Sequence, residues 1–361
     1  MDRIAALVDG ALAAGLGSAA AVSIGDAGRE VGRVVRGRRW REPDLGPPVD
    51  DAAWFDVASL TKPIATVACA MVLVGERRLE LDAPIRRWLP TAASTGTVRH
   101  LLGHAAGCAA HVEFFQDLRE GEHADPRGEL VLRAAHEPAG APGATAVYSD
   151  LGYILLGAIV ERAAEQPLEQ AFRALVAEPL GLAAHYPGQV ACAGAVATEL
   201  DDRGLVTGRV HDENAYFSGG VCGHAGLFAT IDDVARFAAA IVETHGGRPR
   251  GRLRPEVVQH FLATAAAPAA SWRLGWDTPS ATPGVSHAGD RWPRVGAVGH
   301  LGFTGTSLWL DLPRRRWVAL LTNRVHPSRH GGSAEAIKAL RRAVNDAAVE
   351  LLGARAVRVT R

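Results

Sequence analysis

Phe55-Asp56-Val57-Ala58-Ser59-Leu60-Thr61-Lys62-Pro63 opens an apolar run of sequence that ends at Gly75. Proline is tolerated in the first turn of a helix, because its missing N–H would have no acceptor there. Glycine is common just beyond a helix end. The pattern therefore predicts a buried helix over about residues 59–74. It places Ser59 at the positive end of the helix dipole, where a developing oxyanion is stabilised.

Lys62 follows Ser59 by one helical turn, so the two side chains share a face of this helix. Lysine, unlike arginine, can lose its proton when it is desolvated and then act as a base. Of 39 basic residues only Lys62 and Lys338 are lysines, which indicates a chemical role for Lys62. The alternative for an isolated S-x-x-K motif is a serine N-cap beside a surface lysine, and Lys338 keeps a structural interpretation. Because Lys62 should be buried, we predict a pKa well below that of free lysine.

A second segment, Tyr148-Ser149-Asp150, directly precedes an apolar run over residues 151–159. A tyrosine at a junction between a loop and a helix can project into a cleft, and a phenol beside an ammonium group can share its proton. Asp150 could orient Lys62. The alternative is an Asp150 N-cap with a tyrosine that only packs, and in isolation that alternative is the stronger one.

A third segment, His300-Leu301-Gly302-Phe303, lies on an expected strand. Gly302 would let a ligand approach the backbone closely. The backbone N–H of Phe303 could complete an oxyanion hole with the N–H of Ser59. The alternative is a glycine-rich strand edge with a bulge.

The remaining pattern predicts strands near both ends of the chain and helices between them. Strands are expected at residues 19–24, 31–35, 295–301, 306–312 and 317–322, a hairpin within 195–210, and helices up to residue 16, near 98, 129, 151, 168 and 231, after 255, and over 333–352. This order favours an α+β fold over an alternating βαβ fold. We expect one domain, about residues 15–350, in which residues 1–56 and 230–361 form a sheet subdomain and residues 57–229 a mostly helical one, with a cleft between them.

Bulk properties exclude several classes of partner. The formal net charge is zero, which gives no electrostatic basis for binding nucleic acid or an anionic membrane. Asp2 and Asp9 interrupt the opening stretch, which therefore does not resemble a signal peptide, and no apolar run approaches the roughly 18 residues that span a bilayer. The four cysteines are widely spaced without a C-x-x-C pair. We expect a reduced, cytoplasmic protein that is a monomer or a weak oligomer.

Taken together, the three segments resemble the S-x-x-K, Y-x-N and K-T-G boxes of class C β-lactamases, penicillin-binding D-Ala-D-Ala carboxypeptidases and the related family VIII esterases. Order and spacing agree, and similar stretches occur at residues 55–62, 98–102, 148–157, 211–215, 219–228 and 322–324. The resemblance covers most of residues 19–350. It implies a β-lactamase/transpeptidase-like fold, with an antiparallel sheet flanked by helices plus a mostly helical subdomain.

The resemblance also implies roles for individual residues. Ser59 would be acylated, and Lys62 and Tyr148 would share the proton transfers, without a decision as to which is the base. The backbone N–H groups of Ser59 and Phe303 would hold the oxyanion. Such a mechanism needs no metal and no organic cofactor.

Two boxes depart from the family's pattern. The second ends in Asp150 where the family has asparagine, which adds negative charge near Lys62. The third reads His300-Leu301-Gly302 where antibiotic-handling members have Lys-Thr-Gly, so two groups that would hold a substrate carboxylate are missing. We expect these four residues to contact the substrate. The departures suit an esterase, an amidase or an acyl-transfer enzyme with less anionic substrates better than they suit β-lactam or D-Ala-D-Ala turnover.

We therefore predict a serine hydrolase that acts on small ester, amide or β-lactam-like molecules through an acyl-enzyme on Ser59. Two alternatives stay open. An acyltransferase of the same fold would pass the acyl group to an alcohol or an amine. A catalytically silent penicillin-binding-like protein would keep only the fold, although the rarity of lysine in this chain argues against it.

Other motifs carry less signal. His100 and His104 have a spacing that could ligate zinc, but such pairs are expected by chance among 14 histidines, and no H-E-x-x-H glutamate lies between them. Residues 211–214 either line the cleft or brace a loop, and bracing is the safer interpretation. No G-x-S-x-G motif of an α/β-hydrolase is present, and Leu151 excludes the S-D-N box of class A β-lactamases.

Overall fold

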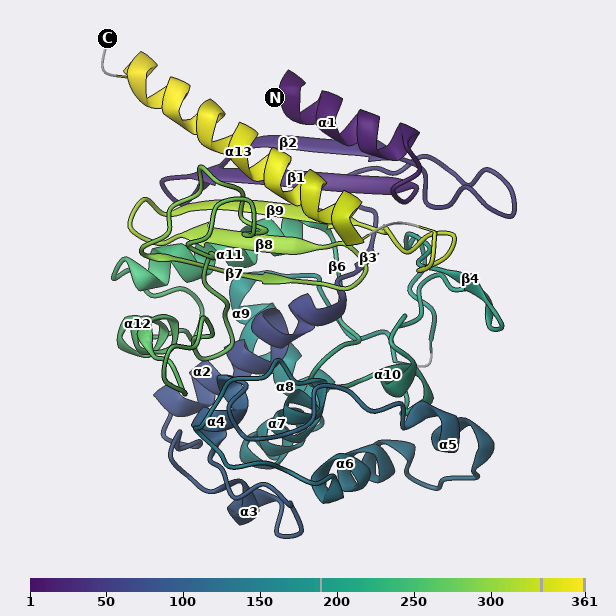
Figure 1. Cartoon of the computed structure of the whole chain (residues 1–361), viewed down its shortest axis with the longest axis vertical. Coiled ribbons are helices and arrows are strands. Elements are labelled where there is room, and N and C mark those ends of the chain that lie inside the picture. The colour runs from purple at the N-terminus through teal and green to yellow at the C-terminus, as the bar shows by residue number, and fades with distance from the viewer. Residues whose placement is uncertain (189, 332–333, 360–361) are drawn as a thin grey trace.

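The computed structural model describes residues 1–188, 190–331 and 334–359, and its centre is a five-stranded antiparallel sheet (Figure 1). The strands lie in the order β2-β1-β9-β8-β7. Their bounds are Ala19–Asp26 for β1, Arg29–Gly37 for β2, Ala297–Leu301 for β7, Ser307–Asp311 for β8 and Arg316–Thr322 for β9. The strands expected near both ends of the chain are confirmed, and β8 and β9 pair antiparallel as the sequence predicted.

Strand β1 joins the two ends of the chain. It pairs with β2 on one side and with β9 on the other, where Ala20 lies opposite Thr322. Successive side chains of a strand point to opposite faces of the sheet. Accordingly, Ala19 and Ala21 belong to one hydrophobic core, and Ala20 and Val22 to the other. A strand of small and apolar residues is thus buried on both faces, which fixes the register of the sheet.

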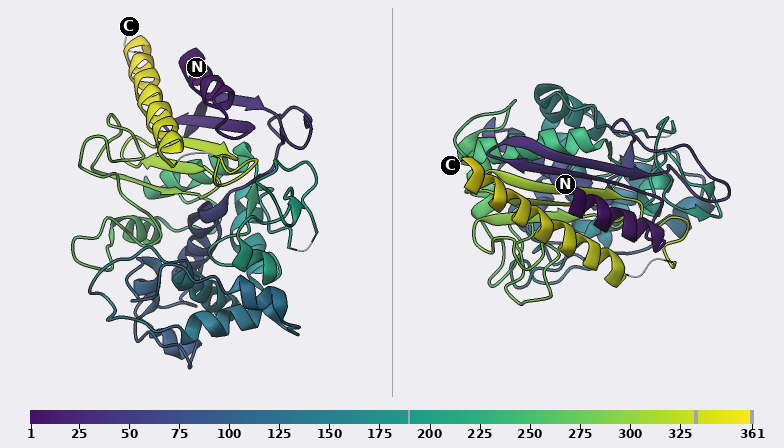
Figure 2. Two further views of the ribbon diagram at one scale, coloured as in Figure 1. Left: turned by 45° about the vertical axis from the view of Figure 1, so that its right-hand side comes forward. Right: turned by 90° about the horizontal axis from the view of Figure 1, so that it is seen from above.

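The two terminal helices cover one face of the sheet. Helices α1 (Asp2–Ala13) and α13 (Ala334–Val359) lie side by side across the strands (Figures 1 and 2). Their apolar side chains share a core with β1 and β8, including Val8, Val344, Val22 and Trp309. The terminal helix expected from the sequence is confirmed, although it extends to Val359, and the expected first residue, Ser333, lies outside the described residues.

The opposite face of the sheet packs on α11 (Ile231–His245), beyond which lies the mostly helical part of the molecule (Figure 1). Its helices are α3 (Ile85–Trp88), α4 (Val98–Leu102), α5 (Phe115–Glu120), α6 (Pro126–His136), α7 (Asp150–Ala164), α8 (Leu168–Phe172), the π-helix η3 (Arg173–Ala177), α9 (Glu178–Leu180), α10 (Glu213–Phe217) and α12 (Pro255–Ala263). Two short antiparallel pairs complete the fold: β3 (Phe55–Asp56) with β6 (Phe228–Ala229), and β4 (Leu200–Asp201) with β5 (Gly204–Leu205). The second pair is the expected hairpin, shorter than predicted.

The helix that follows Ser59 is not uniform. A 3-10 turn, η1 (Ala58–Leu60), leads into a π-helical segment, η2 (Lys62–Val67), and then into α2 (Ala68–Gly75). The sequence predicted one regular helix that ends just before Gly75, and the helix in fact ends one residue later, at Gly75. The apolar pattern could not reveal the wider turn, because the residues are apolar on every side. Segments of π-helix are rare and occur mostly at functional sites.

The helical segment that runs from Ala58 to Gly75 is strongly apolar. Residues Ala58–Gly75 have the length and hydropathy of a membrane span, but 89% of this window is buried within the protein. The expectation that no segment has the length and hydropathy to span a bilayer is therefore wrong. Burial of nearly the whole window identifies it as a core helix, and the rest of the fold packs around it.

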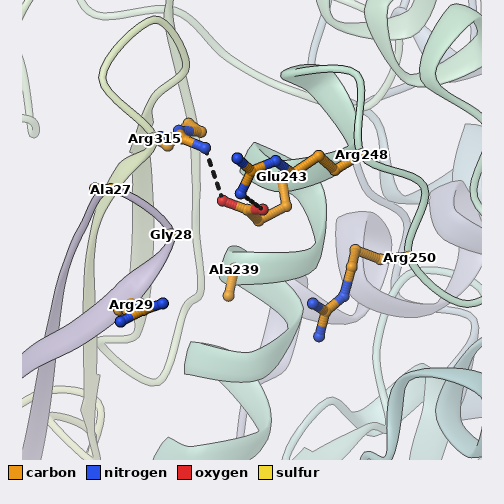
Figure 3. A pocket seen from close by; sticks show the side chains of 8 residues that line it. All are labelled: Ala27, Gly28, Arg29, Ala239, Glu243, Arg248, Arg250 and Arg315. Carbon is orange, nitrogen blue, oxygen red and sulfur yellow. Dashed lines mark hydrogen bonds and ion pairs between the residues drawn. The ribbon is translucent and has the colours of Figure 1, made fainter.

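Two ion pairs on Glu243 join the end of α11 to the segment after it and to the β8–β9 turn, beside the β1–β2 turn (Figure 3). Glu243 accepts hydrogen bonds from Arg248 and Arg315, each at 3.2 Å. Gly28 has a φ of +80°, and a Cβ there would lie 2.1 Å from Glu243 Oε1. Glycine therefore serves two purposes at this turn: it adopts the left-handed conformation and it admits the carboxylate.

Candidate active site

The backbone is strained immediately before Ser59. Ala58 has a φ of +48°, in the left-handed region that residues with a Cβ rarely adopt. The carboxylate of buried Asp56 accepts hydrogen bonds from the N–H of Ala58 at 2.8 Å and from the N–H of His211 at 2.7 Å. Burial raises the pKa of Asp56, and the two N–H groups oppose that rise. Asp56 thus holds the strained residue that positions Ser59.

The turn between β7 and β8 is fastened to the same segment. Thr304 Oγ1 donates to the carbonyl of Asp56, and Thr306 Oγ1 to the carbonyl of Val57, each at 2.9 Å. A Cβ on Gly302 would lie 2.0 Å from Thr306 Oγ1 and 2.6 Å from Val57 O. The space that a side chain would take is thus filled by the protein's own chain. Gly302 also lines the cavity, and close approach of a ligand to its backbone stays a prediction.

Lys62 is fully buried and contacts Ser59. Its Nζ lies 3.0 Å from Ser59 Oγ, 2.7 Å from Asp150 Oδ1 and 3.2 Å from His224 O. The predicted low pKa of Lys62 is wrong. Burial does lower it, but the Asp150 carboxylate and Tyr148 outweigh burial and raise the pKa of Lys62 above its ordinary value. Asp150 was expected near Lys62, but burial was expected to have the larger effect on the pKa of Lys62.

Tyr148 completes a group of three with Ser59 and Lys62. Its ring centroid lies 4.8 Å from Lys62 Nζ, and its hydroxyl interacts with both Ser59 and Lys62. Burial raises the pKa of Tyr148, and the positive charge of Lys62 opposes this only in part. Near neutral pH the Lys62–Tyr148 pair is therefore fully protonated: Lys62 is an ammonium and Tyr148 is a neutral phenol.

Ser149, not Asp150, is the N-cap of α7. Its Oγ accepts from Gly152 N at 3.0 Å and donates to Ala109 O at 2.6 Å. The alternative of an Asp150 cap is wrong, and the carboxylate instead faces Lys62. Burial would raise the pKa of Asp150, but Lys62 and the neighbouring histidines hold it well below its ordinary value.

His111 is a site residue that the sequence analysis missed. Its Nδ1 lies 3.3 Å from Asp150 Oδ2, on the opposite oxygen from Lys62. The hydrogen bond with Asp150 raises the pKa of His111. The residue belongs to no motif and lies in an irregular loop, so the only signal for it is its position in space.

Two backbone N–H groups stand free beside the nucleophile. In the described parts of the chain, neither the N–H of Ser59 nor that of Phe303 donates to a protein acceptor, whereas most backbone donors in folded proteins are paired. Both residues line one cavity. Paired free donors of this kind are what an oxyanion hole requires.

His300 does not replace the lysine of the K-T-G box. It is buried, and burial together with Lys62 lowers its pKa to about 3. Its Nδ1 lies 2.8 Å from Leu301 O, which suits a neutral ring that donates there. The ring is part of an aromatic cluster with Trp272 and Tyr148, at centroid distances of 5.5 and 6.0 Å. His300 therefore supports the Tyr148 ring and brings no charge.

These groups surround a cavity of about 590 Å³. Of the predicted site residues, those that line it are Ser59, Tyr148, Asp150, His300, Leu301, Gly302 and Phe303, and Lys62 lies behind Ser59. His211 and Asp212 line the cavity and also brace it, so both interpretations of residues 211–214 hold. Asp212 accepts from His224 Nε2 at 2.9 Å, and the carbonyl of His224 in turn faces Lys62.

His100 and His104, whose spacing could suit zinc, instead accept hydrogen bonds from backbone N–H groups. His100 Nδ1 accepts the N–H of Thr97 at 3.1 Å, within the cap of α4. His104 is buried against Tyr148, and its Nδ1 accepts the N–H of Ser149 at 3.1 Å. No group of three or more His, Cys, Asp or Glu side chains suited to a metal occurs among the described residues.

Comparison with known proteins agrees with this geometry. The Beta-lactamase family matches residues 4–342. Esterase EstB of Burkholderia gladioli is 30% identical over 334 residues, which span 80% of this chain and 82% of the esterase. A protein of Escherichia coli K12, provisionally named D-alanyl-D-alanine carboxypeptidase, is 28% identical over 313 residues, or 75% of this chain and 69% of that protein.

A solved structure described as "EstCE1, a hydrolase with promiscuous acyltransferase activity" has the same fold. Its TM-score is 0.73 at 23% identity, with 95% of this chain and 98% of that chain covered. The family match extends over nearly the whole chain, and it includes the segments that hold Ser59, Tyr148 and Phe303. This chain therefore belongs to the Beta-lactamase family, and it is a serine hydrolase.

Proposed function

We propose that the protein is an esterase that hydrolyses small carboxylic esters through an acyl-enzyme on Ser59. The observation that carries the proposal is the contact between Ser59 Oγ and the buried Nζ of Lys62, beside Tyr148 and two free backbone N–H groups. The third box itself carries no charge, since His300 is neutral, and it departs in this from the Lys-Thr-Gly of antibiotic-handling members. Esterase EstB is also the relative with 30% identity.

Acylation needs a proton acceptor for Ser59. The Lys62–Tyr148 pair must first lose one of its two protons, and its titration belongs to the pair as a whole. Asp150 stabilises Lys62 as an ammonium, so the missing proton comes from Tyr148. The phenolate then takes the Ser59 proton while Oγ attacks the ester carbonyl, and the N–H groups of Ser59 and Phe303 bind the oxyanion.

The remaining steps reuse the same groups. Collapse of the tetrahedral intermediate breaks the bond to the alcohol, and Tyr148 returns its proton to the leaving oxygen. A water molecule then attacks the acyl-enzyme, Tyr148 accepts its proton, and Ser59 leaves with that proton when the acid is released. Lys62 stays positive throughout and stabilises the phenolate of Tyr148.

The test is covalent labelling together with product analysis. We expect a fluorophosphonate probe to add once to the intact protein, on the peptide that contains Ser59, and to abolish hydrolysis of p-nitrophenyl acetate in proportion to labelling. Labelling of another residue, or none, would overturn the proposal. Addition of an alcohol tests the acyltransferase alternative through the yield of the new ester, and a chromogenic cephalosporin tests β-lactam turnover.

Gly302→Ala is expected to lower kcat/KM for p-nitrophenyl acetate at least tenfold and to destabilise the fold by about 1–3 kcal/mol. The new methyl group must displace Val57 O, a backbone atom two residues before Ser59, and small misplacements of a nucleophile are costly. Gly140→Ala is the matched control, because its nearest neighbouring atom would be 3.9 Å away. Hydrolysis and urea unfolding measure both effects. Equal kcat/KM values for the two variants would show that this close contact does not position Ser59.

A further inference from the structure

Three arginines also line the active-site cavity: Arg324, Arg329 and Arg341. Arg329 is neutralised, because it donates to Glu199 Oε2 at 2.8 Å and to Glu213 Oε1. Arg324 and Arg341 make no ion pair with any carboxylate in the part of the chain that the structure describes. We call these three arginines and the carboxylates of Glu199 and Glu213 the arginine wall. Three positive and two negative charges give this wall a net charge of +1.

Arg341 is a buried cation, 5% exposed, without an acidic partner. Its Nη2 donates to the carbonyls of Gly302 and Thr306, both at 2.8 Å, and its Nε has no partner among the described residues. Burial and the neighbouring Arg324 lower the pKa of Arg341 to about 9. A buried charge that meets only neutral acceptors is costly. An anion in the cavity would therefore stabilise this wall.

Arg324 is the guanidinium that such an anion can reach. It follows the end of β9, and its backbone N–H donates to Thr304 O at 2.8 Å. Its guanidinium lies 4.7 Å from the centroid of the half-exposed Phe303 ring. Phe303 carries one of the two free N–H groups, and Arg324 lines the same cavity as both of them. Its side chain donates no hydrogen bond to any described residue.

We propose that the substrate is an ester that carries a carboxylate, and that Arg324 binds this carboxylate while Phe303 and Ser59 hold the carbonyl oxygen. The inference rests on the proposed esterase function and names its substrate class. A planar guanidinium binds a carboxylate through two parallel hydrogen bonds. The positive group missing from His300-Leu301-Gly302 is thus supplied by an arginine that follows β9. The third box alone led us to expect less anionic substrates, whereas the position of Arg324 indicates substrates with one negative charge.

Charge favours a carboxylate over a phosphate ester. The wall has one net positive charge, which a carboxylate balances and a dianionic phosphate exceeds. The charged groups that interact electrostatically with Arg324 are Arg329, Glu199 and Arg341, and Arg329 and Glu199 already pair with each other. A single negative charge at Arg324 therefore leaves the wall neutral.

The experiment compares matched esters with and without a carboxylate. Mono-p-nitrophenyl glutarate and p-nitrophenyl pentanoate differ on the acyl side, and 3-acetoxybenzoate and phenyl acetate on the alcohol side. In one of the two pairs we expect kcat/KM to be higher for the ester with a carboxylate than for its neutral partner, and that pair identifies the side of the ester that faces Arg324. Arg324→Gln should lower that preference about 10- to 100-fold, as for a charged hydrogen bond, and change the neutral ester less than about threefold. Arg324→Lys should retain part of the preference.

Arg29→Gln is the control, because it removes an equal charge from the hollow in Figure 3, away from the residues that line the active site. Equal loss for both esters in Arg324→Gln would show that Arg324 only supports the Phe303 ring, and would overturn the inference. The absence of any preference in the parent enzyme would overturn it as well.

Binding measurements separate this inference from the proposed function. In a Ser59→Ala background the carboxylate ester should still bind in calorimetry, and added Arg324→Gln should weaken that binding about 10- to 100-fold. Such a result without turnover by the parent enzyme would retain the carboxylate site and reject the esterase. Turnover of all four esters with no effect of Arg324→Gln would retain the esterase function and reject the carboxylate site.

Discussion

Ser59→Ala is expected to lower kcat/KM for p-nitrophenyl acetate by about four orders of magnitude or more, and to abolish the fluorophosphonate adduct. Among the described residues that line the cavity, Ser59 carries the only aliphatic hydroxyl, and none carries a thiol. Tyr148 is the other hydroxyl, and its raised pKa makes the phenolate scarce. Lys62 and the free N–H groups would have no nucleophile to assist.

The matched control for Ser59→Ala is Ser149→Ala. Ser149 caps α7 and donates to Ala109 O, so its removal should cost about 1 kcal/mol of stability and reduce kcat/KM only severalfold. Intact mass and steady-state hydrolysis measure both variants. Residual activity above about 1% in Ser59→Ala, after exclusion of contaminating esterase, would mean that another group attacks the ester.

Much of the fold was predictable because local pattern and global structure agree. Pro63 and Gly75 bracket the central helix, and apolar strands from the two ends of the chain pair in one sheet. The three boxes also supplied Ser59, Lys62, Tyr148 and Phe303 as candidates, and the first three lie in contact. Residue type and spacing were sufficient for these features.

Properties that depend on distances were not predictable. The pKa of Lys62 was placed on the wrong side of its ordinary value although Asp150 was expected nearby, because only the 2.7 Å contact shows that the charge of Asp150 outweighs burial. The close contact between Gly302 and the carbonyl of Val57 could not be predicted either, because it depends on the folded chain. Arg324 is one of many arginines in the sequence, and only the structure shows that no carboxylate faces it.

Asp150→Asn is expected to move the alkaline rise of kcat/KM to a pH that is lower by about 1 to 3. In the parent enzyme Lys62 and Tyr148 both have raised pKa values, so the reactive form, which lacks one proton, becomes more abundant as pH rises. We expect log kcat/KM to increase with a slope near one over neutral and alkaline pH. Removal of the Asp150 charge lowers both pKa values, so the same protonation state is reached at lower pH.

The same substitution should change stability in a defined pH window. The lowered pKa of Asp150 contributes stability above about pH 4, which is lost as pH falls through the folded value. The raised pKa of Lys62 contributes stability below about pH 10, which is lost as pH rises through the folded value. Asp150→Asn should therefore destabilise the fold between these limits, and urea unfolding at pH 5, 7 and 10 measures the loss.

Glu213→Gln is the matched control for the pH profile, since Glu213 lines the same cavity but pairs with Arg329. It should leave the midpoint of the alkaline rise within about 0.5 of the parent pH. At neutral pH, Asp150→Asn should gain in kcat/KM, because more of the enzyme is in the reactive form, and its plateau should fall because a base with a lower pKa accepts a proton less readily. An unchanged profile in Asp150→Asn would mean that the Lys62–Tyr148 pair does not limit the rate. A rise that moves to higher pH would contradict the assignment of Asp150 as the group that keeps Lys62 positive.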